Sequence, residues 1–225
     1  MSTILSIETA TKNCSVSLSV NGKLEICREI AEENFSHAEK LHVFIEEILA
    51  DKRKEIKDLN AIAVSYGPGS YTGLRIGVSS AKGLCYGLNI PLIALDTLEI
   101  LARQLVVENG LIIPMLDARR MEVFCSVFDK DYNCIQSVEA KIVDENSFAE
   151  LKNDELNIHF IGDGAAKCKS IFTDDQFIFH DEIIHPSAKN MSAMAFEKYQ
   201  KGEFADVAYF EPYYLKDFVL PGKKK

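Results

Sequence analysis

The sequence predicts an α/β protein built from two copies of one structural unit, each with a mixed β-sheet. Strand-like apolar runs alternate with segments of helical periodicity along the 225 residues, a pattern typical of α/β folds. The start of the chain and the segment from residue 112 also share one order: an apolar strand that ends in an acid, a polar turn and a second strand. The chain is 47% hydrophobic, which is enough to build a core in each unit.

The first unit opens with a predicted β-hairpin. Residues 4–7 form a short apolar run that leads to Glu8, and apolar residues alternate with polar ones over residues 14–20. This period of two predicts a strand with one buried face. Asn21-Gly22 is a strong hairpin signal, and residues 23–30 are expected to form the return strand.

Helices and strands alternate over the rest of the first unit. Ser36 and Glu39 form a capping box that opens a helix, which is expected to end near Ala50. Its apolar residues recur at helical spacing: Leu41, Phe44, Ile45, Ile48 and Leu49. Further along, we expect a strand at 61–65, a helix to about Gly87, a strand at 90–95, and a helix capped by Asp96 or Thr97 that reaches about Val107.

The second unit repeats the start of the first at an offset of 109 residues, which places Glu8 on Asp117. Its expected elements are strands at 112–117, 123–128, 158–161 and 176–180, and helices near 146–152 and 187–201. Any two strand–turn–strand units could overlay comparably, so chance similarity is the alternative to duplication. We expect subdomains at residues 1–105 and 106–186, with the C-terminal helix and tail, about 187–225, joining the first.

The charge and the cysteine content limit which functions and which cellular location we expect. The chain holds 25 basic and 34 acidic residues, a net charge of −9, which makes it a poor candidate for binding nucleic acid alone. Its six cysteines form no C-x-x-C pair, as expected of reduced thiols in a cytosolic protein. The N-terminus shows no signal peptide, and no apolar stretch could span a membrane. We expect a cytoplasmic location.

The segment 67–77 is rich in glycine but fits neither common phosphate loop. It lacks the lysine of the Walker pattern, and Thr72 stands where the Rossmann pattern needs its third glycine. Gly73, Gly77 and Ala81 recur every four residues and line one helix face, where another backbone can approach closely. The partner of this face is either the capped helix of the same chain or a helix of another chain.

The segment 67–77, together with residues 4–11, 116–119 and 212–216, resembles the TsaB (YeaZ) family over nearly the whole chain. The resemblance implies the duplicated actin-like, sugar-kinase-like (ASKHA) fold. It also implies a role in threonylcarbamoyladenosine (t6A) modification of tRNA position 37. In that family the TsaB-type subunit is a scaffold that binds and stabilises the catalytic TsaD-type subunit, and a TsaE-type ATPase docks on the pair. Homodimers when alone, and only indirect contact with tRNA, are further expectations.

The residues that could support catalysis are poorly placed for it. The turn after Glu8 has no glycine, and the turn after Asp117 carries the bulky Arg119 and Arg120 where a phosphate loop must be open. We expect Asp117 to cap its own turn or to pair with Arg119. Cofactors are expected to be absent, and any nucleotide would bind only in the assembled complex.

A metal site is also not expected. His37 and His42 are five residues apart, which turns them about 140° from each other on a helix, so they are expected to be separate surface residues.

Two functions follow from these observations. The first is a non-catalytic scaffold, with a contact surface formed by Leu41, Phe44, Ile45, Ile48, Gly73, Arg75, Gly77 and Ala81. The second is an independent ATP-dependent kinase or acyltransferase. Titration of the isolated chain with ATP and magnesium separates them.

Overall fold

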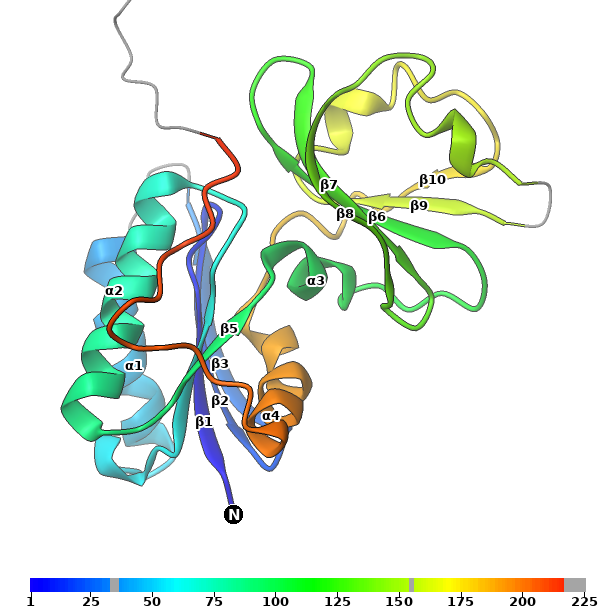
Figure 1. The fold of residues 1–225 in the computed structure, drawn as a ribbon. Helices are drawn as coiled ribbons and strands as arrows, with labels where there is room; N and C mark the ends of the chain where they lie inside the picture. The colour runs from blue at the N-terminus through cyan, green and yellow to red at the C-terminus, as the bar shows by residue number, and fades with distance from the viewer. Residues whose placement is uncertain (33–36, 154–155, 217–225) are drawn as a thin grey trace, which may run out of the picture.

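The computed structural model describes residues 1–32, 37–153 and 156–216. Within these ranges the strands form two five-stranded mixed sheets, with the orders β3-β2-β1-β4-β5 and β10-β9-β6-β7-β8 (Figure 1). Read from its other edge, the second sheet repeats the order of the first with every strand number raised by five. In each unit the first strand is antiparallel to the second and parallel to the fourth. The predicted α/β fold of two units with matching mixed sheets is confirmed.

The first half contains β1 (Thr3–Glu8), β2 (Asn13–Val20), β3 (Lys23–Ala31), α1 (His37–Asp51), η1 (Ile56–Asp58), β4 (Ala61–Ser65), α2 (Tyr71–Leu88), β5 (Leu92–Leu95) and α3 (Thr97–Ala102). The second half contains β6 (Leu111–Asp117), β7 (Glu122–Asp129), β8 (Cys134–Ile142), η2 (Ala149–Leu151), β9 (Ile158–Ile161), η3 (Ala166–Cys168), β10 (Phe177–Phe179), η4 (Ala188–Met191) and α4 (Ser192–Lys201). The offset of 109 carries the bounds of β2 onto those of β7.

Local signals in the sequence set several of these bounds. Asn21 and Gly22 both have positive φ, as the predicted hairpin turn requires. Asp96 caps α3 by accepting hydrogen bonds from the backbone N–H groups of Leu98 and Glu99. Ser70 caps α2 through the N–H of Gly73. The predicted capping box at Ser36 lies outside the described residues.

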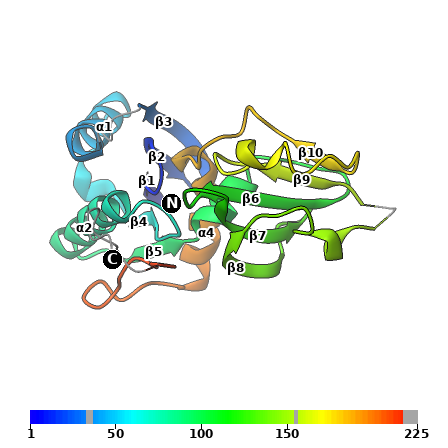
Figure 2. The ribbon, with the colours of Figure 1, turned by 90° about the horizontal axis from the view of Figure 1, so that it is seen from above.

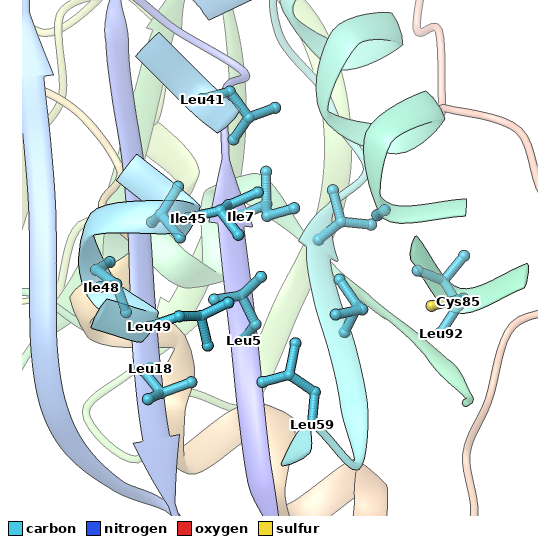
Figure 3. Close-up of a cluster of buried hydrophobic side chains, with 14 of the residues drawn as sticks. Leu5, Ile7, Leu18, Leu41, Ile45, Ile48, Leu49, Leu59, Cys85 and Leu92 are labelled. Carbon is cyan, nitrogen blue, oxygen red and sulfur yellow. The ribbon is translucent and has the colours of Figure 1, made fainter. Parts of the chain in front are cut away.

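Helices cover both faces of the first sheet (Figures 1 and 2). α1 and α2 lie on one face, where their apolar residues pack against β1, β2 and β4 in a continuous core (Figure 3). α4 lies on the other face, and Met194 and Ala195 contact a cluster that includes Ile4 and Ile93.

Each half contributes one helix that packs against the sheet of the other half. α3 belongs to the first half in sequence, but its Leu98 and Leu101 pack with Ile112 of the second sheet. α4 follows the second sheet and returns to the first. These crossed helices join the two halves through apolar contacts. The residue limits of the subdomains stay a prediction.

Three element predictions differ from the structure. The helix expected to reach Val107 ends at Ala102. The helix expected at 146–152 is a short 3-10 turn, and it follows Phe148, which is in the left-handed conformation. Strand β8 was not predicted. It is an edge strand with exposed residues along its whole length, so the buried-face signal that identifies inner strands is weak there.

Candidate functional site

The glycines of segment 67–77 hold the turn that follows β1 against the N-terminus of α2. A side chain at Gly73 would overlap the carbonyl oxygen of Thr9, and one at Gly77 would overlap its hydroxyl. That hydroxyl donates a hydrogen bond to the Gly73 carbonyl at 2.8 Å. The Ser70 N–H donates to the Ala10 carbonyl at 2.7 Å. Close approach therefore occurs within the chain, and the main neighbour of these glycines is the β1–β2 turn rather than another helix.

Glu8 lies beneath this turn and is completely buried. Its Oε1 accepts a hydrogen bond from the Ala10 N–H at 2.5 Å, whereas Oε2 has no hydrogen-bond partner in the part of the chain that the structure describes. Burial raises its pKa to about 7, against smaller opposing effects from the Ala10 N–H and the nearby Ser65 hydroxyl. A buried, partly protonated acid under a closed turn is poorly placed to bind a metal–nucleotide complex.

Asp117, the matching acid of the second half, is also occupied. Its Oδ1 accepts a hydrogen bond from the Arg119 N–H at 3.0 Å and pairs with Lys167. The Asp117 N–H donates to Asp163 Oδ1 at 2.9 Å. The expected role of Asp117 as a cap of its own turn is confirmed.

Most residues expected at the contact surface lie in the core instead. Leu41, Ile45 and Ile48 point from α1 toward the sheet (Figure 3), and all three are buried. On α2 the three expected residues Gly73, Gly77 and Ala81 are also buried. In the isolated chain these six residues are buried by contacts within the chain, because the apolar and small-residue faces that the sequence showed are the faces used for folding. Partner binding itself stays a prediction.

The other two expected residues are more accessible. Phe44 is half-buried at the edge of the core, and Arg75 is exposed. The Arg75 guanidinium lies 4.4 Å from the centre of the Tyr71 ring, and its Nε donates to the Tyr214 hydroxyl at 3.2 Å.

A second stripe of small residues lies on the outer face of α2. Ser79, Gly83 and Gly87 are exposed and recur every four residues. A Cβ at Gly83 or Gly87 would meet no atom within 4 Å other than its chain neighbours and the backbone of its own helix. Glycine within a helix costs about 1 kcal/mol relative to alanine, and no contact within the described chain offsets that cost here. The spacing of four residues in the sequence also indicates this stripe, which is shifted by two positions from the stripe of Gly73, Gly77 and Ala81.

The two histidines of α1 have different environments. His37 is buried, and its Nε2 lies 2.7 Å from the Thr11 carbonyl oxygen, so the expectation that it is a surface residue was wrong. It is buried because the N-terminal end of α1 packs onto the β1–β2 turn. His42 is exposed and contacts the Ser80 hydroxyl at 3.4 Å. Among the described residues, no cluster of three or more His, Cys, Asp or Glu side chains could hold a metal ion.

The C-terminal segment, residues 205–216, runs across the first half and reaches the second (Figure 1). The Tyr213 N–H donates to the Tyr66 carbonyl at 2.8 Å. Gly67, with a φ of +132°, leaves room for the Tyr213 carbonyl, which a side chain there would meet at 2.5 Å. Lys216 then forms an ion pair with Glu122 at the start of β7. Residues 67–77 and 212–216, two parts of the motif set, are thus neighbours in space.

None of the helices in the described ranges has the length and apolar character needed to cross a membrane.

Comparison with known proteins gives consistent results. The sequence profile of the family described as "TsaD: tRNA N6-adenosine threonylcarbamoyltransferase" matches residues 28–220. The chain is 30% identical to the "tRNA threonylcarbamoyladenosine biosynthesis protein TsaB" of Escherichia coli strain K12, covering 98% of this chain and 99% of that one. It is also 30% identical to the protein of the same name from Bacillus subtilis strain 168, covering 95% and 94% of the two chains.

A solved structure shares the fold. "YeaZ from Pseudomonas aeruginosa" superposes with a TM-score of 0.83 at 24% identity, covering 96% of this chain and 100% of that one. The profile match and the near full-length relatives agree with the motifs at residues 4–11, 67–77, 116–119 and 212–216. The chain belongs to the family that this profile describes and, within it, to the TsaB (YeaZ) proteins of tRNA threonylcarbamoyladenosine biosynthesis.

Proposed function

We propose that this chain is a non-catalytic scaffold subunit required for threonylcarbamoyl transfer to adenosine 37 of tRNA. It binds and stabilises a TsaD-type catalytic subunit, and a TsaE-type ATPase docks on the assembled pair in the cytoplasm. The observation that carries this proposal is the state of the two acids that end the first strands. Glu8 is buried under a closed turn, and Asp117 caps its own turn and pairs with Lys167. Both acids serve the fold.

The outer face of α2 is the contact surface we propose for the catalytic subunit. It presents the exposed stripe Ser79, Gly83 and Gly87, flanked by Arg75 and by Tyr86, which is 85% exposed. Small residues let a second helix approach closely, and an exposed tyrosine supplies the amphipathic contact area that interfaces favour. In the absence of the catalytic subunit, the same face joins two copies of this chain.

Replacement of Gly83 by leucine tests this surface. Because no other part of the described chain packs against the Cβ position, Gly83→Leu is expected to leave the fold intact and to reduce binding of the TsaD-type subunit at least tenfold. Ala193→Leu, at an exposed position of α4, adds comparable bulk on another face and is the control. Binding is measured by titration of the purified partner, and t6A formation by the reconstituted proteins. Undiminished binding by Gly83→Leu contradicts this surface.

The alternative, an ATP-dependent enzyme in its own right, has a direct test. The isolated chain is titrated with ATP and magnesium, and phosphate release is followed. We expect no binding in the micromolar range and no turnover, because neither acid is free to hold the metal–nucleotide complex. Micromolar binding with turnover contradicts the scaffold proposal.

A further inference from the structure

Two adjacent arginines form the tip of the β6–β7 turn, and the scaffold role leaves them unexplained. Arg119 and Arg120 are exposed, with φ values of +72° and +50°. Positive φ is uncommon for residues other than glycine, so arginine is an unfavourable choice at both positions. Neither guanidinium group forms a hydrogen bond or an ion pair with any residue that the structure describes.

The duplication shows that packing does not require these arginines. At the offset of 109 residues, Arg119 and Arg120 correspond to Ala10 and Thr11 of the first half. Ala10 is 1% exposed and Thr11 7%, because the N-terminus of α2 closes over that turn. In the second half the place of the 18-residue α2 in the chain order is taken by the three-residue η3. The second copy of the turn is therefore uncovered.

The charges around the turn leave the two guanidinium groups in excess. Asp117 pairs with Lys167, and Glu122 pairs with Lys216, so the acids on either side of the turn are each neutralised by a lysine. The third nearby acid, Asp163, faces inward, where it accepts the Asp117 N–H and lies 3.9 Å from His185. A cationic tip thus projects from a chain whose net charge is −9.

We propose that Arg119 and Arg120 bind the phosphodiester backbone of the tRNA directly. This inference rests on the proposed function, which supplies the tRNA, and it replaces the indirect contact expected from the sequence. The guanidinium group forms paired hydrogen bonds to phosphate oxygens, and the β6–β7 ladder with the Asp117 cap holds the turn in place. Carboxylates of a protein partner offer the same chemistry at isolated positions, whereas RNA presents a phosphate at every nucleotide.

The double variant Arg119→Asn/Arg120→Gly separates binding from folding, because asparagine and glycine adopt positive φ more readily than arginine does. We expect its thermal stability to equal or exceed that of the wild type. The control is Arg53→Asn, at an exposed arginine of φ +50° in the turn after α1. The dissociation constant for tRNA is measured at several salt concentrations, for the isolated chain and for its complex with the TsaD-type subunit.

The expected result is a loss of tRNA affinity of roughly tenfold in the double variant. The slope of log affinity against log salt concentration is expected to become smaller in magnitude by about one to two. Arg53→Asn and assembly with the TsaD-type subunit are expected to be unchanged. Unchanged tRNA affinity and salt dependence, or no tRNA binding by the wild type in either form, overturns the inference. Loss of assembly with unchanged tRNA affinity overturns it in favour of a protein carboxylate. Failure of the proposed function is read separately, as absence of t6A formation by the wild-type complex.

Discussion

At the scale of single residues, burial of Glu8 carries an electrostatic cost. It is fully buried, and one of its two oxygens has no hydrogen-bond partner among the described residues. Burial disfavours the charged form, which is why its pKa rises from 4.5 to about 7. The acid that ends β1 is therefore a group that destabilises the folded state whenever it is ionised.

The stability of the chain should depend on pH through Glu8. Between about pH 4.5 and 7 the folded state binds more protons at Glu8 than the unfolded state does, so the free energy of unfolding falls as pH rises. The total fall is about 3 kcal/mol, and it ends above pH 7. Glu8→Gln is expected to remove this fall and to be at least as stable as the wild type at pH 8.

Urea denaturation of both proteins from pH 5 to pH 8 measures the effect. Asp96, whose pKa burial raises to about 6, contributes a similar fall in both proteins and so cancels in the comparison. An unchanged slope in Glu8→Gln would show that Glu8 is not the group responsible.

At the scale of elements, α2 has two stripes of small residues with opposite roles. The inner stripe, Gly73 and Gly77, lies against Thr9 and lets the β1–β2 turn pack on the helix. The outer stripe, Gly83 and Gly87, meets open space. The two stripes have the same spacing in the sequence. They differ only in how closely the rest of the folded chain packs against each position.

Replacement of Gly77 and replacement of Gly83 by alanine should change the free energy of unfolding in opposite directions. Gly77→Ala gains helix propensity but forces its Cβ into the Thr9 hydroxyl, so we expect a net loss of about 1–3 kcal/mol. Gly83→Ala gains about 1 kcal/mol at no steric cost. Chemical denaturation of the isolated chain measures both. A Gly77→Ala protein as stable as Gly83→Ala would contradict the close packing of the turn.

At the scale of the whole molecule, the crossed helices and the C-terminal segment join the two halves. α3 packs on the second sheet and α4 packs on the first, both through apolar contacts. The C-terminal segment adds polar contacts along its path: Lys82 donates to the carbonyl oxygens of Ala208 and Phe210, at 3.2 and 2.8 Å. At the end of this segment, Lys216 forms an ion pair with Glu122 of the second half.

Removal of the Lys82 contacts should loosen the C-terminal segment without unfolding either half. In Lys82→Ala the backbone amide of Tyr213 is expected to exchange with solvent faster, on the order of tenfold, because two hydrogen bonds from a charged donor are lost. The amide of Ala205, bonded to the Leu92 carbonyl, should be unchanged. Lys201→Ala, which breaks only an ion pair within α4, is the control. Equal exchange at Tyr213 in the two variants would show that Lys82 does not hold the segment.

The sequence by itself determined the class of fold, the internal repeat and most of the strands. The Asn21-Gly22 turn and the Asp96 cap act through neighbours in the chain, so local physics decides them. The alternation in residues 14–20 correctly predicted strand β2, but the expectation of a single buried face was wrong. Ser15, Ser17 and Ser19 are buried as well, and Ser15 and Ser17 form hydrogen bonds with the backbone of Ala188 in η4. The motif set also identified the family. The sequence indicated the exposed edge strand β8 poorly, because burial on one face is the signal that reveals a strand.

Only the tertiary structure decided which faces are inside. Periodicity shows that Leu41, Ile45, Ile48, Gly73 and Gly77 share helix faces, but it does not show what covers them; the sheet and the β1–β2 turn do. The two copies of that turn differ for the same reason. One lies under α2 and is closed, whereas the other has only η3 at the matching place and leaves Arg119 and Arg120 exposed. Burial depends on contacts between residues far apart in the chain, and a pattern within one segment does not contain them.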